Sequence, residues 1–342
     1  METVYYAGLD IHKKTISYCV KTQSGEIVRE GSIASRRSEL EHWQRSMPRP
    51  WTAAMEATLF TGWIYDQLKA GGAQVTVADP SMLKAISASK KKNDRVDARK
   101  IADLLRCDLL HESYMAPPEV RELRRILRFR NLLVRQTVQM KNRIAGFLME
   151  TGSEYDSRRL HGRKYFEQLL AQLEGETPDS VIHLLKLSRG AVDALSRMDR
   201  QLIRGLLKQP QLSERVKLLT SIGGIGNIAA LSWALETGEP GRFHTRGQAI
   251  SYCGLCSAQI SSAGREYRGP ISKQCNHHLQ WVLVEAAKVA PRWNSALAAV
   301  HARALQRGNR NRATLEVARK LVAYLLAVDR SRKPYQMRMA EE

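Results

Sequence analysis

The sequence has few cysteines, few acidic residues and no long hydrophobic run. Five cysteines in 342 residues, an odd number, exclude a disulfide framework and indicate a reducing compartment. No apolar run reaches the roughly 18 residues of a membrane span, and the first residues lack the basic and then apolar order of a secretory signal. We therefore expect a soluble cytoplasmic protein with no membrane partner.

The shortage of acidic residues is uneven along the chain. Lys and Arg number 54 against 34 Asp and Glu, and most of the resulting net charge of +20 falls after residue 115. Such an excess is typical of proteins that contact the phosphate backbone of nucleic acids. Hydrophobic residues make up 43% of the chain, which indicates folded domains and not a disordered basic tail. The composition predicts a folded protein with a polyanionic partner.

Residues 1–115 begin with strand-like segments, after which helix-like and strand-like segments alternate. β-Branched and aromatic runs come first, and helix-like and strand-like segments then alternate, which predicts a mixed five-stranded sheet with helices in an α/β domain. The expected strands are 4–10, 15–20, 26–33, 51–56 and 74–79, and the expected helices are 38–47, 61–70 and 94–110.

The rest of the chain is predicted to be helical. Two long apolar stripes predict helices over 119–149 and 178–208, which would form an antiparallel coiled-coil arm within residues 116–210, for nucleic-acid binding and oligomerisation. Residues 211–342 are rich in helix patterns and punctuated by glycine, and we assign them to a third, C-terminal domain.

A glycine-rich segment in the C-terminal domain allows two interpretations. Gly224 and Gly226 separate two apolar halves of residues 218–235, as in a helix-hairpin-helix element whose backbone amides bind a phosphate. A tight turn with close helix packing explains the same glycines equally well.

Four carboxylates have a spacing that suits metal binding. Asp10 ends the first predicted strand and Glu56 ends the fourth. Asp94 and Asp97 lie three apart at the start of a predicted helix, so they share one helix face. Each alone is more typical of a cap or a turn. If they converge, their charges require hard cations, and a pair of Mg²⁺ ions would activate a nucleophile at a phosphodiester. The four residues are therefore predicted to be both metal ligands and catalytic groups.

Basic residues cluster near these carboxylates and on two of the predicted helices. A solvated helix face would also carry such charges, but their density favours phosphate contact. The predicted nucleic-acid contacts are Lys91, Lys92, Arg95, Arg121, Arg124, Arg125, Arg128, Arg310 and Arg312.

The order of a GLDIHK strand, a Glu after the fourth strand and a DRVDA helix resembles a known domain. It is similar to the RuvC-like DEDD domain of the transposases of the one-hundred-ten family of bacterial insertion sequences and of the related pilin-gene invertase. Residues 242–287 resemble the second signature block of that family, through Tyr252, the following Gly-Leu pair and the GPISK run. Two departures lie near its key serine: Ser257 replaces a proline and Ala263 replaces a glycine.

The resemblance implies a RuvC/RNase H-like fold and a serine nucleophile that works with the metal site. Ser262 matches the family serine, and Ser261 is its close rival. Three neighbouring basic residues are placed to stabilise charge that develops on the attacked phosphate. They are Arg265, Arg268 and Lys273.

The same resemblance implies a bacterial, nucleoid-associated DNA transposase or site-specific recombinase. It implies a non-coding bridge RNA that selects donor and target DNA, and a homo-oligomer, a dimer or tetramer in which one protomer's RuvC-like domain meets another's serine domain. Two alternatives stay open. One is a metal-dependent, Holliday-junction resolvase-like nuclease that uses water as nucleophile, and the other is a nucleic-acid-binding protein without catalysis.

A possible zinc site is not favoured. Cys253 and Cys256 form a C-x-x-C, followed about twenty residues later by Cys275, His277 and His278. A second C-x-x-C is absent and the later spacing is irregular, so small buried thiols explain the cysteines better.

Overall fold

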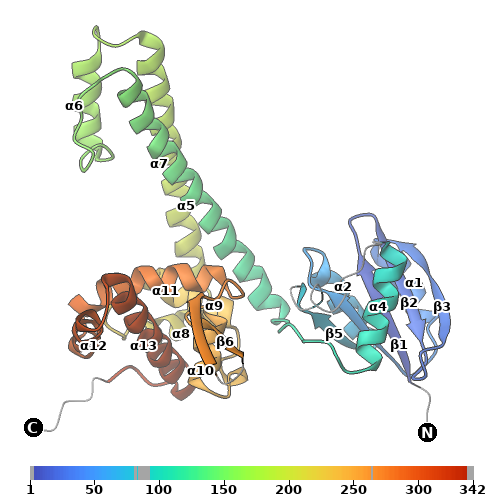
Figure 1. Cartoon of the computed structure of the whole chain (residues 1–342). Helices are drawn as coiled ribbons and strands as arrows, with labels where there is room; N and C mark the ends of the chain where they lie inside the picture. Colours follow the sequence, from blue (N-terminus) through green and yellow to red (C-terminus); the bar gives the residue numbers. More distant parts are fainter. Residues whose placement is uncertain (1–3, 81–82, 84–92, 263–264, 337–342) are drawn as a thin grey trace, which may run out of the picture. The chain divides into compact units, whose positions relative to one another are not determined.

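The computed structural model describes residues 4–80, 83, 93–262 and 265–336. By its internal contacts the chain divides into two units, Met1–Pro118 and Glu119–Glu342 (Figure 1). The predicted division into three domains, with the arm separate from the C-terminal part, remains a prediction.

The N-terminal unit contains the predicted mixed five-stranded sheet, in the order β3-β2-β1-β4-β5. The first three strands form an antiparallel meander, and β4 and β5 run parallel to β1. The strands are β1 Tyr5–Ile11, β2 Thr15–Lys21, β3 Ile27–Ala34, β4 Trp51–Glu56 and β5 Gln74–Ala78.

Helices cover both faces of this sheet. Leu9 of β1 packs in a common core with residues of α1 (Arg37–Arg45) and α2 (Thr61–Ala70). Gly8 faces the other side, where α4 (Asp94–Arg106) lies so close that a Cβ on Gly8 would stand 2.2 Å from a helix carbonyl oxygen. Because side chains alternate along a strand, every second residue of β1 after Gly8 points toward the α4 side.

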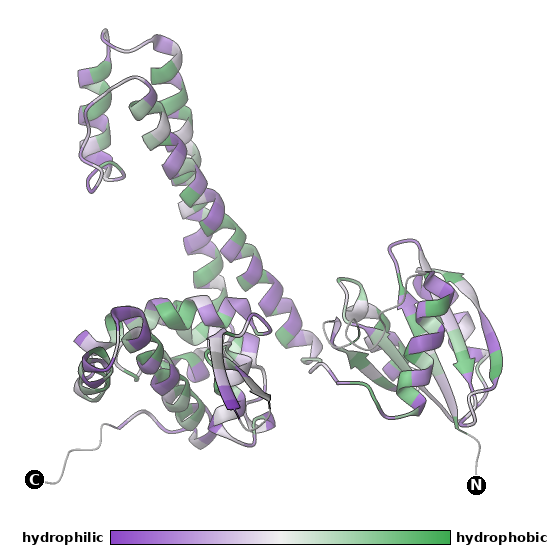
Figure 2. Cartoon of the chain, in the orientation of Figure 1, coloured by the Kyte–Doolittle hydropathy of each residue, from purple (hydrophilic) through white to green (hydrophobic). Residues whose placement is uncertain are grey.

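Two long helices form an arm in the C-terminal unit, close to the predicted bounds. They are α5 (Pro118–Glu150) and α7 (Asp179–Leu207), which lie side by side in Figure 1. Arg130 of α5 and Asp199 of α7 form an ion pair of 2.6 Å. Along α5, hydrophilic and hydrophobic residues alternate at helical spacing (Figure 2). Whether the pair is a true coiled coil remains a prediction.

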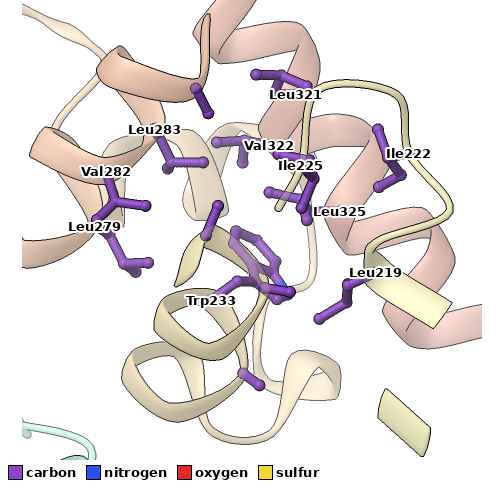
Figure 3. Close-up of a cluster of buried hydrophobic side chains, with 14 of the residues drawn as sticks. Leu219, Ile222, Ile225, Trp233, Leu279, Val282, Leu283, Leu321, Val322 and Leu325 are labelled. Atoms are coloured by element: carbon purple, nitrogen blue, oxygen red, sulfur yellow. The ribbon is translucent and has the colours of Figure 1, made fainter. Parts of the chain in front are cut away.

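The remaining helices surround one core. Trp233 is fully buried in it among leucine and isoleucine side chains, including Leu219, Ile225 and Leu325 (Figure 3). The indole Nε1 of Trp233 donates a 2.8 Å hydrogen bond to buried Asp329. The elements are α8 Pro210–Leu219, α9 Asn227–Thr237, η1 Pro240–Arg242, α10 Arg246–Tyr252, α11 His277–Val289, η2 Ala290–Arg292, α12 Ser295–Gln306 and α13 Arg310–Ser331.

Three features differ from the sequence-based expectation. The helix expected over 94–110 ends at Arg106, because Asp108 adopts a left-handed backbone with φ of 54°. The polar link between the long helices contains its own helix, α6 (Arg163–Leu173). The serine-bearing segment forms a hairpin of β6 (Ser257–Ser262) and β7 (Arg265–Ile271).

None of the helices in the described part of the chain combines the length and the apolar character that crossing a bilayer requires.

Candidate active site

Three side chains from β1, the turn after it and the start of α4 gather in the N-terminal unit. They are Asp10, His12 and Asp94, whose potential ligand atoms all lie within 4.8 Å of one another. The Nε2 atom of His12 lies 3.1 Å from Asp10 Oδ2 and 3.5 Å from Asp94 Oδ1. Within the described residues, no other group of three or more His, Cys, Asp or Glu side chains has such geometry. We call these three residues the Asp10 cluster.

Local structure explains why Asp10 and Asp94 meet. Asp10 follows Gly8 by two residues on β1, so its side chain points to the face on which α4 packs. The N-cap of α4 is Asn93, whose side chain accepts a hydrogen bond from the amide of Arg95 at 3.1 Å. Asn93 therefore performs the capping role, which leaves the Asp94 carboxylate available to the cluster.

Glu56 lies on the strand beside Asp10 but outside the Asp10 cluster. Leu9 of β1 pairs in parallel register with Met55 of β4, so Asp10 and Glu56 follow at equivalent positions. Leu9 and Met55 both belong to the core on the α1 and α2 side. Glu56 therefore points, like Asp10, to the opposite face, at the carboxyl ends of two parallel strands. It is half-buried, and its carboxylate does not belong to the group within 4.8 Å.

Asp97 contributes charge to the site. Its Oδ1 lies 3.5 Å from Lys100 Nζ, and it also stands outside the Asp10 cluster. Burial raises the pKa of Asp10 above its ordinary value; His12 opposes this rise, and the negative charges of Asp94 and Asp97 add to it. Negative charge is thus concentrated at one locus, which is the environment that a bound cation stabilises.

Sequence reasoning missed His12. Its signal was its position two residues after Asp10, which places both side chains on the same side of an extended chain. The side chain of His12 is 52% exposed, against 13% for Asp10, so the cluster opens to solvent.

The candidate serines lie in the other unit, at the end of β6. The backbone of Ser262 pairs with Arg265 and that of Ser261 with Glu266 across the hairpin. Arg265 and Lys273 are exposed near it. The side chains of both serines and of Arg268 lie outside what the structure describes, so the nucleophile remains a prediction.

Two of the arginines predicted to contact phosphate hold a buried carboxylate. Arg128 pairs with Glu236 of α9 through two hydrogen bonds of 2.9 and 2.8 Å, and Arg124 lies 3.7 Å from the same carboxylate. Asn276 donates a third hydrogen bond of 3.0 Å to it. Glu236 is fully buried, so the first turns of the arm are fixed to the C-terminal body. Of the remaining predicted residues on this helix, Arg125 is exposed and Arg121 is half-buried.

We expect Arg128→Met to destabilise the C-terminal unit by about 3 kcal/mol, because it leaves a buried carboxylate without its main partner. Urea unfolding of the full chain measures the change. Arg125→Met, an exposed arginine on the same helix, is the matched control and should shift stability by less than about 0.5 kcal/mol. Equal effects of the two variants would contradict the assigned role of Arg128.

The Glu236 network also predicts a pH dependence of stability. Burial raises the pKa of Glu236, but the hydrogen bonds and charge of Arg128, with Asn276 and Arg124, outweigh it and hold the pKa below the ordinary value of 4.5. This group therefore stabilises the fold above about pH 4.5, and the stabilisation is lost as pH falls through the lowered folded pKa. Thermal unfolding between pH 5 and 3 should show a shallower loss of stability for Glu236→Gln than for the wild type.

The two glycines of the predicted hairpin have different surroundings. Gly224 has a φ of +95°, and a Cβ there would stand 2.5 Å from the Cα of Ala290. Gly226 is the N-cap of α9 and faces open space. The tight-turn interpretation therefore accounts for Gly224, whereas the phosphate-binding interpretation remains a prediction for the Gly226 end.

The remaining predicted contacts have different surroundings. Arg95 pairs with Glu30 of β3 at 2.8 Å. Lys91 and Lys92 lie outside the described residues. Arg310 lines a basic hollow of about 450 Å³ with Lys288, Arg292 and His301, and Arg312 lines a second one nearby with Arg303 and Arg307. The second hollow also contains the carboxylate of Glu316, so the first is better suited to phosphate groups.

The cysteines near the serine hairpin have dissimilar surroundings. Cys253 is fully buried, and burial raises the pKa of its thiol. Cys256 and Cys275 are half-buried, and the Sγ of Cys275 lies 3.6 Å from His277 Nδ1. None of them belongs to the metal-type group found within the described residues.

Two family profiles match the chain. One, described as "Transposase" and specific to the DEDD domain of IS110 elements, matches residues 7–152. The other, described as "Transposase IS116/IS110/IS902 family", matches residues 216–302. The first match contains the Asp10 cluster, Glu56 and Asp97, and the second contains Ser262.

Curated relatives agree with these profiles. The transposase for insertion sequence element IS1111A of Coxiella burnetii is 23% identical, with 98% of this chain and 92% of the relative covered. The transposase for insertion sequence element IS1328 of Yersinia enterocolitica is 24% identical, with 84% of each covered. Putative transposase y4qE of Sinorhizobium fredii is also 24% identical, over 82% of this chain and 70% of the relative.

Proposed function

Because the chain belongs to the IS110 family of transposases, we propose that it cuts and rejoins DNA with a divalent-metal site in its N-terminal unit and a serine nucleophile in its C-terminal unit. The observation that supports this most directly is the convergence of Asp10 and Asp94, from a strand and a helix more than eighty residues apart, on one solvent-accessible point. Acidic side chains gather in this way where cations bind substrate phosphates.

The donor set fits a hard divalent cation. Asp10 and Asp94 offer carboxylate oxygens, and His12 lies between them. We propose Mg²⁺ as the metal ion because it prefers oxygen ligands and is bound by one or two carboxylates together with substrate phosphates. When bound there, the ion supplies Lewis acidity for phosphodiester chemistry. Glu56, on the same sheet face, and Asp97, on the same helix, extend the negative surface around it.

Ser262 would supply the nucleophile, with Ser261 as its rival. Attack by the serine Oγ on a DNA phosphorus forms a phosphoserine ester while one phosphorus–oxygen bond of the DNA breaks. The serine proton is balanced by protonation of the released deoxyribose oxygen. The ester bond is conserved, so the reverse attack by a deoxyribose hydroxyl rejoins the strands. Arg265 and Lys273 would stabilise charge on the phosphate.

Nucleic acids are the proposed partners: donor and target DNA, and a non-coding bridge RNA that pairs with both. The +20 net charge supports a large phosphate load, and the basic hollows beside Arg310 and Arg312 would take part of it. We further propose that the active form is a homo-oligomer, a dimer or tetramer. Light scattering of the purified protein with and without its co-bound RNA measures its mass.

Metal binding tests the N-terminal site independently of catalysis. We expect Mn²⁺, used as a paramagnetic substitute for Mg²⁺, to bind the wild-type chain and to bind Asp94→Asn at least about tenfold more weakly, since one carboxylate ligand is lost. Asp108→Asn, which changes an exposed carboxylate just after α4 that lies outside the Asp10 cluster, is the control and should bind normally. Unchanged Mn²⁺ affinity in Asp94→Asn would contradict the proposed site.

A further inference from the structure

A pocket of about 560 Å³ lies between α5 and α11 in the C-terminal unit. We propose that it binds a single unpaired nucleobase, of DNA or RNA, stacked on the indole of Trp281. This inference rests on the proposed function for the nature of the partner. We call the site the Trp281 pocket; it is lined by Asn131, Val134, Arg135, Val138, Gln139, His277, His278 and Trp281.

Trp281 is a large aromatic side chain held at the surface. It is 52% exposed, although most tryptophans of a folded chain bury far more of their surface. Leu279, Val282 and Leu283 of the same helix point into the core (Figure 3). The buried side of α11 is therefore fixed by packing, and its other side presents the indole in a defined place. An aromatic platform of this kind is what unstacked bases bind.

The opposite wall of the pocket comes from α5 and is suited to the flat face of a base. Val134 and Val138 lie one helical turn apart on the same side of α5, and Val138 is 50% exposed. The side chains of Asn131 and Gln139 add amide groups near this wall. Asn131 Nδ2 lies 3.3 Å from His278 Nδ1, which joins the two helices across the pocket. Apolar walls with a few polar groups are typical of sites for small planar ligands.

Charge favours a nucleic acid over an apolar protein segment as the occupant. Exposed Arg135 lines the pocket on one side, and exposed His277 lies at the first turn of α11 on the other. The N-terminus of a helix adds partial positive charge near this edge. None of the described residues that line the pocket is acidic. Arg135 and the N-terminal end of α11 would therefore attract a phosphate beside a bound base.

The test uses the full-length chain with Asp10→Asn, so that no probe is cut during binding. The probes are 20-base-pair duplexes with one unpaired thymine or uracil, and the same duplexes with an abasic unit in its place, made as DNA and as RNA. We expect the full-length Asp10→Asn chain to bind the base-containing probe about tenfold more tightly than the abasic probe. The additional variant Trp281→Ala should lose this preference and bind both probes like the abasic one. The DNA and RNA arms identify which nucleic acid supplies the base.

Trp293→Ala is the matched control, because Trp293 is 72% exposed and does not line the pocket. It should keep the preference for the unpaired base. Retention of the preference in Trp281→Ala, or an equal loss of affinity for all probes, would overturn the proposal. A change in oligomeric mass without a base preference would overturn it too, in favour of a second copy as the occupant. Binding of every duplex without base preference rejects the pocket alone, whereas failure to bind any nucleic acid rejects the proposed function as well.

Discussion

Replacing Asp10 by Asn is expected to lower DNA cleavage by at least about 1,000-fold, equivalent to roughly 4 kcal/mol of lost transition-state stabilisation. Asp10 is the least exposed member of the Asp10 cluster and is fixed by β1, so no flexible neighbour replaces it. The substitution removes one negative charge from a site where negative charges repel, so stability should not fall. The rate of cleavage of DNA from the flanks of the encoding locus, with Mg²⁺ present, measures the effect.

Asp108→Asn provides a matched control for this loss. Asp108 is exposed, stands outside the Asp10 cluster and has a left-handed backbone that asparagine tolerates well. Its variant should cleave DNA like the wild type. A rate within a few-fold of wild type in Asp10→Asn, with the protein folded, would contradict a catalytic role for the cluster.

Replacing Ser262 by Ala should abolish strand exchange, by about 10⁴-fold or more, while leaving the fold and metal binding intact. In the proposed mechanism Ser262 supplies the hydroxyl that forms the covalent ester, so its loss removes the reaction route and does not merely slow it. Strand exchange is measured by sequencing joined products from a donor and target pair. Ser257→Ala, at the other end of β6, is the control and should retain activity.

The same assay distinguishes Ser261 from Ser262 as the nucleophile. Activity that survives Ser262→Ala but disappears in Ser261→Ala would reassign the nucleophile by one position along β6. Cleavage that survives both substitutions would show that water attacks the DNA, which is the nuclease alternative.

The fold of the N-terminal unit was predictable because its strand and helix patterns in the sequence agree with the observed elements. The strand run at 4–10 became β1, shifted by one residue, and the run at 51–56 became β4 with the same bounds; aromatic and β-branched residues begin both runs. The i and i+3 spacing of Asp94 and Asp97 likewise identified a helix face. The role of Asn93 as the cap, which leaves Asp94 available, required the structure.

Tertiary contacts account for what the sequence did not reveal. The arginines at 124 and 128 look in sequence like a phosphate-binding cluster, but their partner Glu236 is more than a hundred residues away. A tight turn with close packing was one of the two interpretations for Gly224, but its partner Ala290, far along the chain, required the structure. Long-range pairing of this kind leaves no periodic signal, so a charge cluster in the sequence does not show which of its basic residues pair with a buried carboxylate.

We propose that the serine and the metal site act together on one DNA strand. The most direct test adds Mg²⁺ and DNA from the flanks of the encoding locus to the protein purified with its co-bound nucleic acid, and searches for a protein–DNA adduct stable to heat and detergent. We predict an adduct that maps to the β6 peptide, requires both Asp10 and Ser262, and is lost when co-purified RNA is digested. Cleaved DNA without any adduct, formed equally by Ser262→Ala, would contradict the account.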